Sequence, residues 1–139
     1  MSAVEFNGVS QRFGKELALN DFSLKVEEGS LTTLLGPSGC GKTTALRLLA
    51  GFLTPSEGEI LVDGKDISKT PASKRGFGMV FQSYSLFPHL SAEENIAFGL
   101  KLKRYSQSQI NKRVAELLEI TALQNQAKKF PHQLSGGQQ

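Results

Sequence analysis

The sequence has little that could cross-link the chain or anchor it in a membrane. Cys40 is the single cysteine among 139 residues, so an internal disulfide and a cysteine-based metal site are both excluded. No apolar run approaches the roughly 18 residues that can span a bilayer. The first residues also lack the basic segment and apolar segment of a secretion signal. We therefore expect a cytoplasmic chain.

The charge balance is too even to define a partner by itself. The chain has 16 basic and 13 acidic residues and a formal net charge of +3. A nucleic-acid-binding domain is usually far more basic, so we expect no nucleic-acid partner. The hydrophobic share of 39% and the charged share of 21% are typical of a globular domain. Internal repeats, low-complexity tracts and heptads are absent from the sequence.

The first part of the chain has the patterns of β-strands. Phe22, Leu24 and Val26 alternate with polar residues, which indicates a strand with one buried face. Residues 31–35 form an apolar run that leads directly into Gly36, as a fully buried strand would. Further short strands are predicted at residues 59–62, which end in the turn pair Asp63-Gly64, and at residues 78–82.

After Pro88 the pattern changes to that of helices. A capping box places Ser at the start of a helix and Glu or Gln three residues later, and each side chain bonds the other residue's backbone N–H. Three such pairs occur: Ser91 with Glu94, Ser106 with Gln109, and Ser135 with Gln138. We predict a strand-rich core over residues 1–87, whose nucleotide-binding motif is the one at residues 36–44, and a smaller helical subdomain over residues 88–139.

A phosphate-binding motif lies between the predicted strand and a predicted helix at 44–50. Residues 36–44, GPSGCGKTT, match G-x-x-x-x-G-K-[ST] and are called the phosphate loop below. Its glycines allow backbone N–H groups to converge on an anion, and the helix N-terminus favours the same negative charge. Lys42 is expected to reach the β- and γ-phosphates, Thr43 to bind Mg²⁺ and Thr44 to meet the α-phosphate. The predicted contacts with nucleotide are Gly36, Ser38, Gly39, Cys40, Gly41, Lys42, Thr43 and Thr44.

Cys40 lies within this loop, but the sequence assigns it no general base. We therefore interpret it as a small loop residue that faces away from the phosphates, rather than as a nucleophile. If the loop binds nucleotide, ATP should slow the modification of this cysteine by a thiol reagent.

The last six residues, LSGGQQ at 134–139, are called the signature segment. Together with the phosphate loop, they make essentially the whole chain resemble the ATP-binding subunits of ABC transporters. The resemblance implies an α/β fold of the P-loop NTPase class. That fold has a RecA-like core, an N-terminal antiparallel β subdomain and a helical subdomain. The segment 75–90 is most similar to bacterial importers of polyamines, ferric iron, sulfate, phosphonates or sugars, and the transported solute stays open.

The resemblance also implies roles for residues outside the phosphate loop. Phe13 would stack on adenine, and Gln82 would contact Mg²⁺ or the attacking water, with Lys42 and Gln82 as the catalytic residues. Residues 83–90 would receive a coupling helix of the permease at the cytoplasmic face of the membrane. The signature residues Ser135, Gly136, Gly137 and Gln138 would bind ATP held by a second ATP-binding subunit. From the residues alone, Phe13 and the apolar side chains of 83–90 could equally belong to a core.

The same resemblance implies parts that this sequence does not contain. Hydrolytic members continue past the signature segment with an apolar strand ending in Asp-Glu and then a histidine. Asp63 ends an apolar run but lies too early and within a turn, and both His89 and His132 precede the signature segment. We therefore expect an incomplete chain that lacks the C-terminal part of the core, does not hydrolyse ATP, and leaves residues 31–35 without neighbouring strands.

Three other functions remain open from the sequence. A soluble P-loop kinase of the guanylate type can carry a similar loop, but it would lack the signature segment. An ABC ATPase that acts on DNA or ribosomes rather than in transport is a second possibility. A chain that binds nucleotide or a partner without catalysis is a third.

Overall fold

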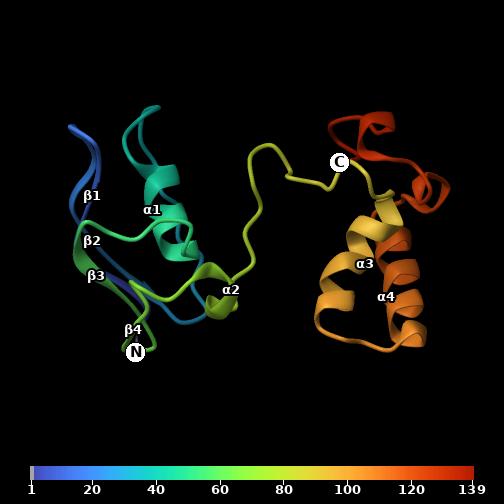
Figure 1. Cartoon of the computed structure of the whole chain (residues 1–139), viewed down its shortest axis with the longest axis horizontal. Coiled ribbons are helices and arrows are strands. Elements are labelled where there is room, and N and C mark those ends of the chain that lie inside the picture. Colours follow the sequence, from blue (N-terminus) through green and yellow to red (C-terminus); the bar gives the residue numbers. More distant parts are fainter. Residues whose placement is uncertain (1) are drawn as a thin grey trace. The chain divides into compact units, whose positions relative to one another are not determined.

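The computed structural model describes residues 2–139, with the side chain of Ser2 left out. The chain divides into two compact units, one ending at Met79 and the other comprising Val80–Gln139. Figure 1 shows strands and helices in the first unit and a pair of antiparallel helices in the second. The predicted boundary between residues 87 and 88 stays a prediction.

The first unit contains one antiparallel sheet with the strand order β2-β1-β3-β4. Phe6 in the central strand β1 lies opposite Leu24 on one side and Ile60 on the other. Asp63 and Gly64 both have positive φ, at 50° and 75°, as the predicted tight turn between β3 and β4 requires. The strands are β1 (Ser2–Phe13), β2 (Glu16–Glu27), β3 (Glu57–Val62) and β4 (Lys65–Asp66).

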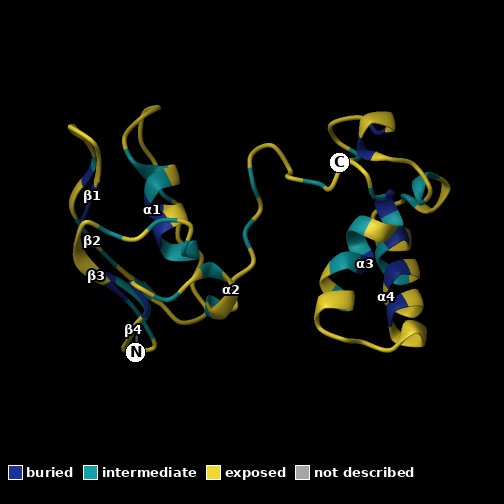
Figure 2. Cartoon of the chain, in the orientation of Figure 1, coloured by how far each residue is buried: buried dark blue, intermediate teal, exposed yellow. Residues whose placement is uncertain are grey.

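Helix α1 (Lys42–Ala50) is held against this sheet by its apolar face. Ala45 is 2% exposed and Leu48 is fully buried, and burying a leucine side chain stabilises a fold by about 1.5–3 kcal/mol. The helix ends at Gly51, which has a φ of 82° and caps the helix with its backbone N–H, as the sequence predicted. The core of the first unit consists of Phe6, Val9, Leu19, Ala45, Leu48, Ile60 and Ile67 (Figure 2).

Two predicted strands are wrong in this structure. Residues 31–35 and 78–82 contain no assigned strand. Leu31 is 96% exposed, Leu35 88% and Val80 92%, although Leu34 packs against the core of the first unit. The apolar pattern identified segments suited to a buried strand. A strand also needs a hydrogen-bonded neighbour, and the described residues pair none with either segment.

The second unit is built on helices α3 (Ala92–Leu102) and α4 (Gln107–Ile120). Their shared core consists of Ala97, Ile110, Val114 and Leu118. Both helices begin with complete capping boxes, Ser91 with Glu94 and Ser106 with Gln109, as predicted. Two short 3₁₀ turns follow, η1 (Gln124–Gln126) and η2 (Pro131–Gln133). Among the described residues, no helix is long and apolar enough to cross a membrane.

A half-buried arginine, Arg75, holds the C-terminal end of α1. Arg75, the last residue of the short helix α2 (Ala72–Arg75), donates through Nη1 to the carbonyl oxygens of Leu48 at 2.7 Å and Leu49 at 2.8 Å. Its Nε donates to Thr70 O at 2.6 Å and its Nη2 to Ser68 O at 3.2 Å. Burial lowers the pKa of this guanidinium. The cation therefore adds a charged donor to carbonyls at the end of the helix, where Leu48 O also accepts from Gly51 N.

Candidate nucleotide-binding site

The phosphate loop passes directly into α1, and the start of this helix has no side-chain cap. Gly41 is the N-cap residue, with a φ of 93°, and the first turn contains no acidic residue. The first N–H groups of a helix have no intrahelical acceptor, and a capping side chain normally satisfies one or two of them. The first turn of α1 therefore offers its N–H groups and its positive potential to an external anion.

Lys42 brings a positive charge into the same loop. Its Nζ donates to Gly36 O at 2.8 Å and to Pro37 O at 2.7 Å, so the ammonium group bridges the two ends of the loop. The side chain thus curls back over the backbone that precedes it. A cation held among backbone dipoles at a helix N-terminus makes this loop suited to phosphate groups.

Two glycines are required by close approach within the loop. A Cβ on Gly36 would lie 2.6 Å from Cys40 Sγ. A Cβ on Gly41 would lie 2.8 Å from Ala18 O and 2.9 Å from Leu19 Cδ1, so Gly41 lies directly against strand β2. Such distances are below any normal contact, and the positive φ of Gly41 adds backbone strain for other residues. Because Gly41 has no side chain, the loop can lie directly against the sheet.

The remaining loop residues lie at its surface. Ser38, Gly39 and Thr43 are exposed, and Thr44 is half-buried in the first turn of α1. A hollow of 180 Å³ opens beside the loop, lined in part by Phe22, Leu34 and Lys42. The sequence-predicted contacts from Gly36 to Thr44 are thus brought together at one end of α1.

Cys40 contacts the lysine of the loop, and the expectation that it faces away from bound phosphates stays a prediction. Its Sγ lies 3.3 Å from Lys42 Nζ, so the thiol contacts the cation that is expected to bind phosphate. The residue is exposed and is the only cysteine of the chain. A thiol in this position can report on the occupancy of the loop.

The two other predicted nucleotide contacts lie outside the loop. Phe13 is the last residue of β1 and is 46% exposed, so its ring is accessible to a planar base. Gln82 is exposed in the irregular segment that opens the second unit. Their roles in stacking and in metal or water binding stay predictions.

The signature segment forms a tight turn with its own cap. Ser135 N donates to Gln138 Oε1 at 3.0 Å, and Gln138 N lies 3.4 Å from Ser135 Oγ, which is the third predicted capping box. Gln138 N and Gln139 N both donate to Ser135 O at 3.0 Å. Gly136 and Gly137 are exposed between them, and a Cβ on either would meet nothing within 4 Å. Space for a ligand against these two glycines is therefore open.

The segment 83–90, called the docking loop below, lies on the surface of the second unit. Tyr84 is 49% exposed and Phe87 38%. The ring of Phe87 packs on Phe98 of α3, with 4.3 Å between ring centroids, and on His89 at 6.1 Å. The interpretation of these aromatic side chains as ordinary core residues does not fit their exposure.

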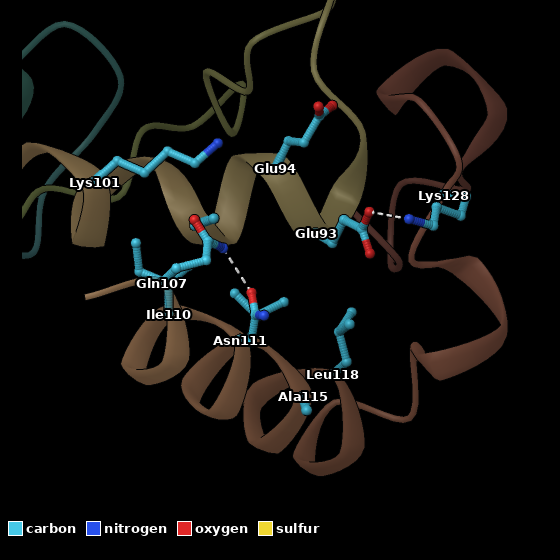
Figure 3. A pocket seen from close by; sticks show the side chains of 11 residues that line it. Glu93, Glu94, Lys101, Gln107, Ile110, Asn111, Ala115, Leu118 and Lys128 are labelled. Carbon is cyan, nitrogen blue, oxygen red and sulfur yellow. Dashed lines mark hydrogen bonds and ion pairs between the residues drawn. The ribbon is translucent and has the colours of Figure 1, made fainter. Parts of the chain in front are cut away.

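A larger hollow of 390 Å³ lies between α3 and α4, away from the phosphate loop in sequence (Figure 3). Its floor includes Ile110 and Leu118, and its rim carries the ion pair between Glu93 and Lys128. Glu94 adds a second carboxylate, whose pKa is lowered by hydrogen bonds from the backbone and side chain of Ser91. Lys101 and Lys128 balance these two carboxylates, and the hollow has neither a glycine-rich loop nor an uncapped helix start among its lining residues, so size alone does not identify the nucleotide site.

Sequence reasoning missed two residues that organise these segments. Arg75 fastens the end of α1, and Asn95 of α3 bonds the backbone of the docking loop. Their partners are main-chain groups, which carry no residue-type signal in the sequence. Among side chains that bond the backbone, the capping residues could be recognised in the sequence because their partners lie three positions away.

The fold and these motifs define an ATP-binding cassette. A sequence model of the family described as ABC transporter matches residues 19–139, so the chain belongs to that family. It is similar to the spermidine/putrescine import ATP-binding proteins PotA of Protochlamydia amoebophila and Methylococcus capsulatus. The first is 49% identical over 99% of this chain and 37% of the relative, the second 52% over 96% and 35%.

Solved structures confirm the predicted fold class. The chain is similar to the dimeric cassette MJ0796 in a post-hydrolysis state bound to ADP and Pi, with a TM-score of 0.85 and 33% identity. A second dimeric structure of MJ0796, titled a bacterial ABC transporter cassette, gives a TM-score of 0.84. Each comparison covers 97% of this chain and 64% of the solved chain. The chain thus spans just over a third of the length of the curated relatives named above.

Proposed function

We propose that this chain binds ATP at the phosphate loop as part of the ATP-binding subunit of an ABC importer. The observation that carries this proposal is the start of α1, which lacks a side-chain cap and places the ammonium of Lys42 within the loop. Both features favour bound phosphate, and ATP is the nucleotide that this family uses.

Mg²⁺ would enter this site with the nucleotide. The donor set fits the ion, because the Thr43 hydroxyl is an exposed oxygen ligand beside the loop, and Mg²⁺ prefers oxygen ligands shared with phosphates. Gln82 offers an exposed amide oxygen as a further ligand in the proposal. When bound, the ion would neutralise charge on the phosphates. Thr43 holds its place in the first turn of α1, and Lys42 supplies the second positive charge.

We also propose that two copies enclose ATP between them. The open glycines Gly136 and Gly137 and the self-capped Ser135 would face nucleotide held by the partner copy. The dimeric state of the similar MJ0796 structures supports this arrangement. Phe13 would stack on the adenine of the nucleotide in its own subunit.

The proposed transport partner is a permease that contacts the docking loop at the cytoplasmic face of the membrane. The exposed aromatic side chains of this loop support a protein interface. The imported solute proposed from the named relatives is a polyamine, because their identity of about one half extends over nearly the whole chain. Loss of spermidine and putrescine uptake after deletion of the gene would support this solute, and normal uptake of both would exclude it.

The test of nucleotide binding is calorimetric titration with Mg-ATP. Lys42→Ala should weaken binding by at least about tenfold, because a charge-assisted bond to phosphate contributes about 1.5–3 kcal/mol. Lys65→Ala is the matched control, since Lys65 is an exposed lysine in β4 of the same unit, and it should leave the affinity unchanged. Equal affinities of the two variants would reject the phosphate loop as the binding site.

A further inference from the structure

The docking loop is bracketed by one side chain of α3. Asn95 Oδ1 accepts a hydrogen bond from Phe87 N at 2.9 Å. Its Nδ2 donates to the carbonyl oxygens of Phe87 at 3.2 Å and of Leu90 at 3.0 Å. It also lies 3.0 Å from Ser91 O. A single carboxamide therefore satisfies both backbone groups of Phe87 and closes the end of the loop on α3.

These hydrogen bonds between Asn95 and the docking loop are called the bracket. They require a side chain that both accepts and donates hydrogen bonds at a fixed distance from the helix. A carboxylate could accept from Phe87 N but could not donate to the carbonyls, and an apolar side chain could do neither. The ring of Phe87 also packs on Phe98, which lies one turn after Asn95 on the same helix. Backbone and side chain of Phe87 are thus both held to α3.

The beginning of the same loop has an unfavourable backbone. Tyr84 and Ser85 are consecutive non-glycine residues with φ of 60° and 52°. The left-handed conformation costs roughly 1–2 kcal/mol for each such residue. Strained backbone of this kind persists only where its surroundings fix it, and the bracket at Phe87 fixes the chain two residues later. Released from Asn95, this loop would relax and change how Tyr84 is presented.

We infer that Asn95 is a positioning residue that holds the docking loop in the conformation that the membrane subunit recognises. This inference rests on the proposed function, since the partner is the proposed permease. Asn95 itself is half-buried and lies beneath the loop, so it acts through Phe87 and Tyr84 rather than by offering its own surface.

The test compares Asn95→Asp with the matched control Asn111→Asp. Asn111 is an exposed residue of α4 whose amide contacts only the neighbouring Gln107. A negative charge at position 95 lies near the N-terminus of α3, where the helix dipole favours it, so the helix should form in the variant. If Asn95→Asp nevertheless fails to fold, Asn95→Gln keeps the carboxamide but displaces it by one methylene and serves as the second variant.

Three quantities are measured on each variant. Hydrogen exchange of the Leu90 amide, which donates to Phe87 O, should accelerate by about tenfold in Asn95→Asp, because the bonds from position 95 to the Phe87 and Leu90 carbonyls are lost. Affinity for Mg-ATP should stay within about twofold of the parent chain, since the hydrogen bonds of Asn95 go to residues 87, 90 and 91 and not to the phosphate loop. Retention of co-expressed, detergent-solubilised membrane subunits should fall by about tenfold. Asn111→Asp should match the parent chain in all three.

Unchanged exchange at Leu90 would overturn the bracket, and full retention of the membrane subunits despite faster exchange would overturn its positioning role. Equal loss of ATP affinity and of retention would also overturn the inference, because it would indicate general destabilisation. Failure of the parent chain to bind Mg-ATP or to retain membrane subunits would instead contradict the proposed function. The exchange measurement would still report on the bracket in that case.

Discussion

The N-termini of α1 and α3 differ in what their first backbone N–H groups can bind. At α3, Ser91 and Glu94 satisfy each other's backbone N–H groups, and acidic residues occupy the first turn. At α1, a glycine takes the capping position, the first turn has no acidic residue, and Lys42 adds positive charge. The first arrangement is complete without a ligand. The second leaves favourable potential for one, which distinguishes a structural helix start from a binding helix start.

Because the N-terminus of α1 has no side-chain cap, other contacts hold this helix in place. Arg75 closes its C-terminal end, Gly41 seats the loop on β2, and Ala45 and Leu48 anchor the middle. These contacts hold the middle and both ends of α1, and they leave the N–H groups of its first turn available to phosphate.

The largest effect is expected from Arg75→Ala, which removes the attachment of α1 at its closed end. Several carbonyls, including those of Leu48 and Leu49, would lose a charged donor at once. We expect the free energy of unfolding of the first unit to fall by about 3 kcal/mol, measured by urea denaturation. Lys74→Ala, an exposed neighbour in α2, is the control. A loss no larger than that of this control would contradict the attachment.

Gly41→Ala should be the next most damaging change, because it introduces both strain and collision at the open end of α1. The φ of 93° and the 2.8 Å approach to Ala18 O predict a cost of about 2 kcal/mol in thermal denaturation and a loss of Mg-ATP binding. Gly136→Ala in the signature segment meets no atom within 4 Å and should change stability by less than about 0.5 kcal/mol. Similar costs at both positions would mean that the two glycines do not differ in role.

Ser91→Ala tests the closed start of α3 and should cost about 1 kcal/mol, the usual contribution of a serine cap. The hydroxyl accepts from Glu94 N, and its loss leaves that group without its partner. Circular dichroism during thermal unfolding measures the change, with Ser108→Ala, an exposed serine inside α4, as the control. Mg-ATP affinity should not respond, and a parallel loss of affinity would show that the two helix starts are not independent.

Acid should weaken α3 through the same capping box, with the smallest effect of the series. Hydrogen bonds from the backbone and side chain of Ser91 lower the pKa of Glu94 from its ordinary value. The stabilisation is therefore complete above the unfolded pKa and is lost as pH falls through the lower, folded pKa. In Glu94→Gln, melting temperature should depend less on pH across this window than in the parent chain. Identical pH profiles would exclude the contribution of Glu94.

Local features of the fold could be predicted from the sequence because their partners are near in the chain. The capping boxes at Ser91, Ser106 and Ser135 and the end of α1 at Gly51 were all confirmed. The segments 31–35 and 78–82 were predicted as strands and are not strands, because pairing depends on residues far away in sequence. An apolar pattern shows only that a segment could be buried.

The phosphate loop was the part of the candidate site that the sequence located best. Its residues are consecutive, so the structure could only refine their geometry, including the contact between Cys40 and Lys42. Arg75 and Asn95 could not be found in this way. Arg75 bonds carbonyls 26 and 27 residues away, and any residue type would present the same carbonyl. Outside the capping pattern, side chains that bond backbone groups are therefore visible only once the chain is folded.

The most direct test of the open helix start is the reaction rate of Cys40, since its thiol lies 3.3 Å from Lys42 Nζ and no other cysteine competes for the reagent. The rate of labelling by a maleimide is measured with Mg-ATP, with Mg-AMP and without nucleotide. If the loop and α1 hold the β- and γ-phosphates, Mg-ATP should slow the reaction by about tenfold or more, and Mg-AMP should have little effect. Equal rates under all three conditions, at concentrations that saturate binding, would contradict a phosphate site at the start of α1.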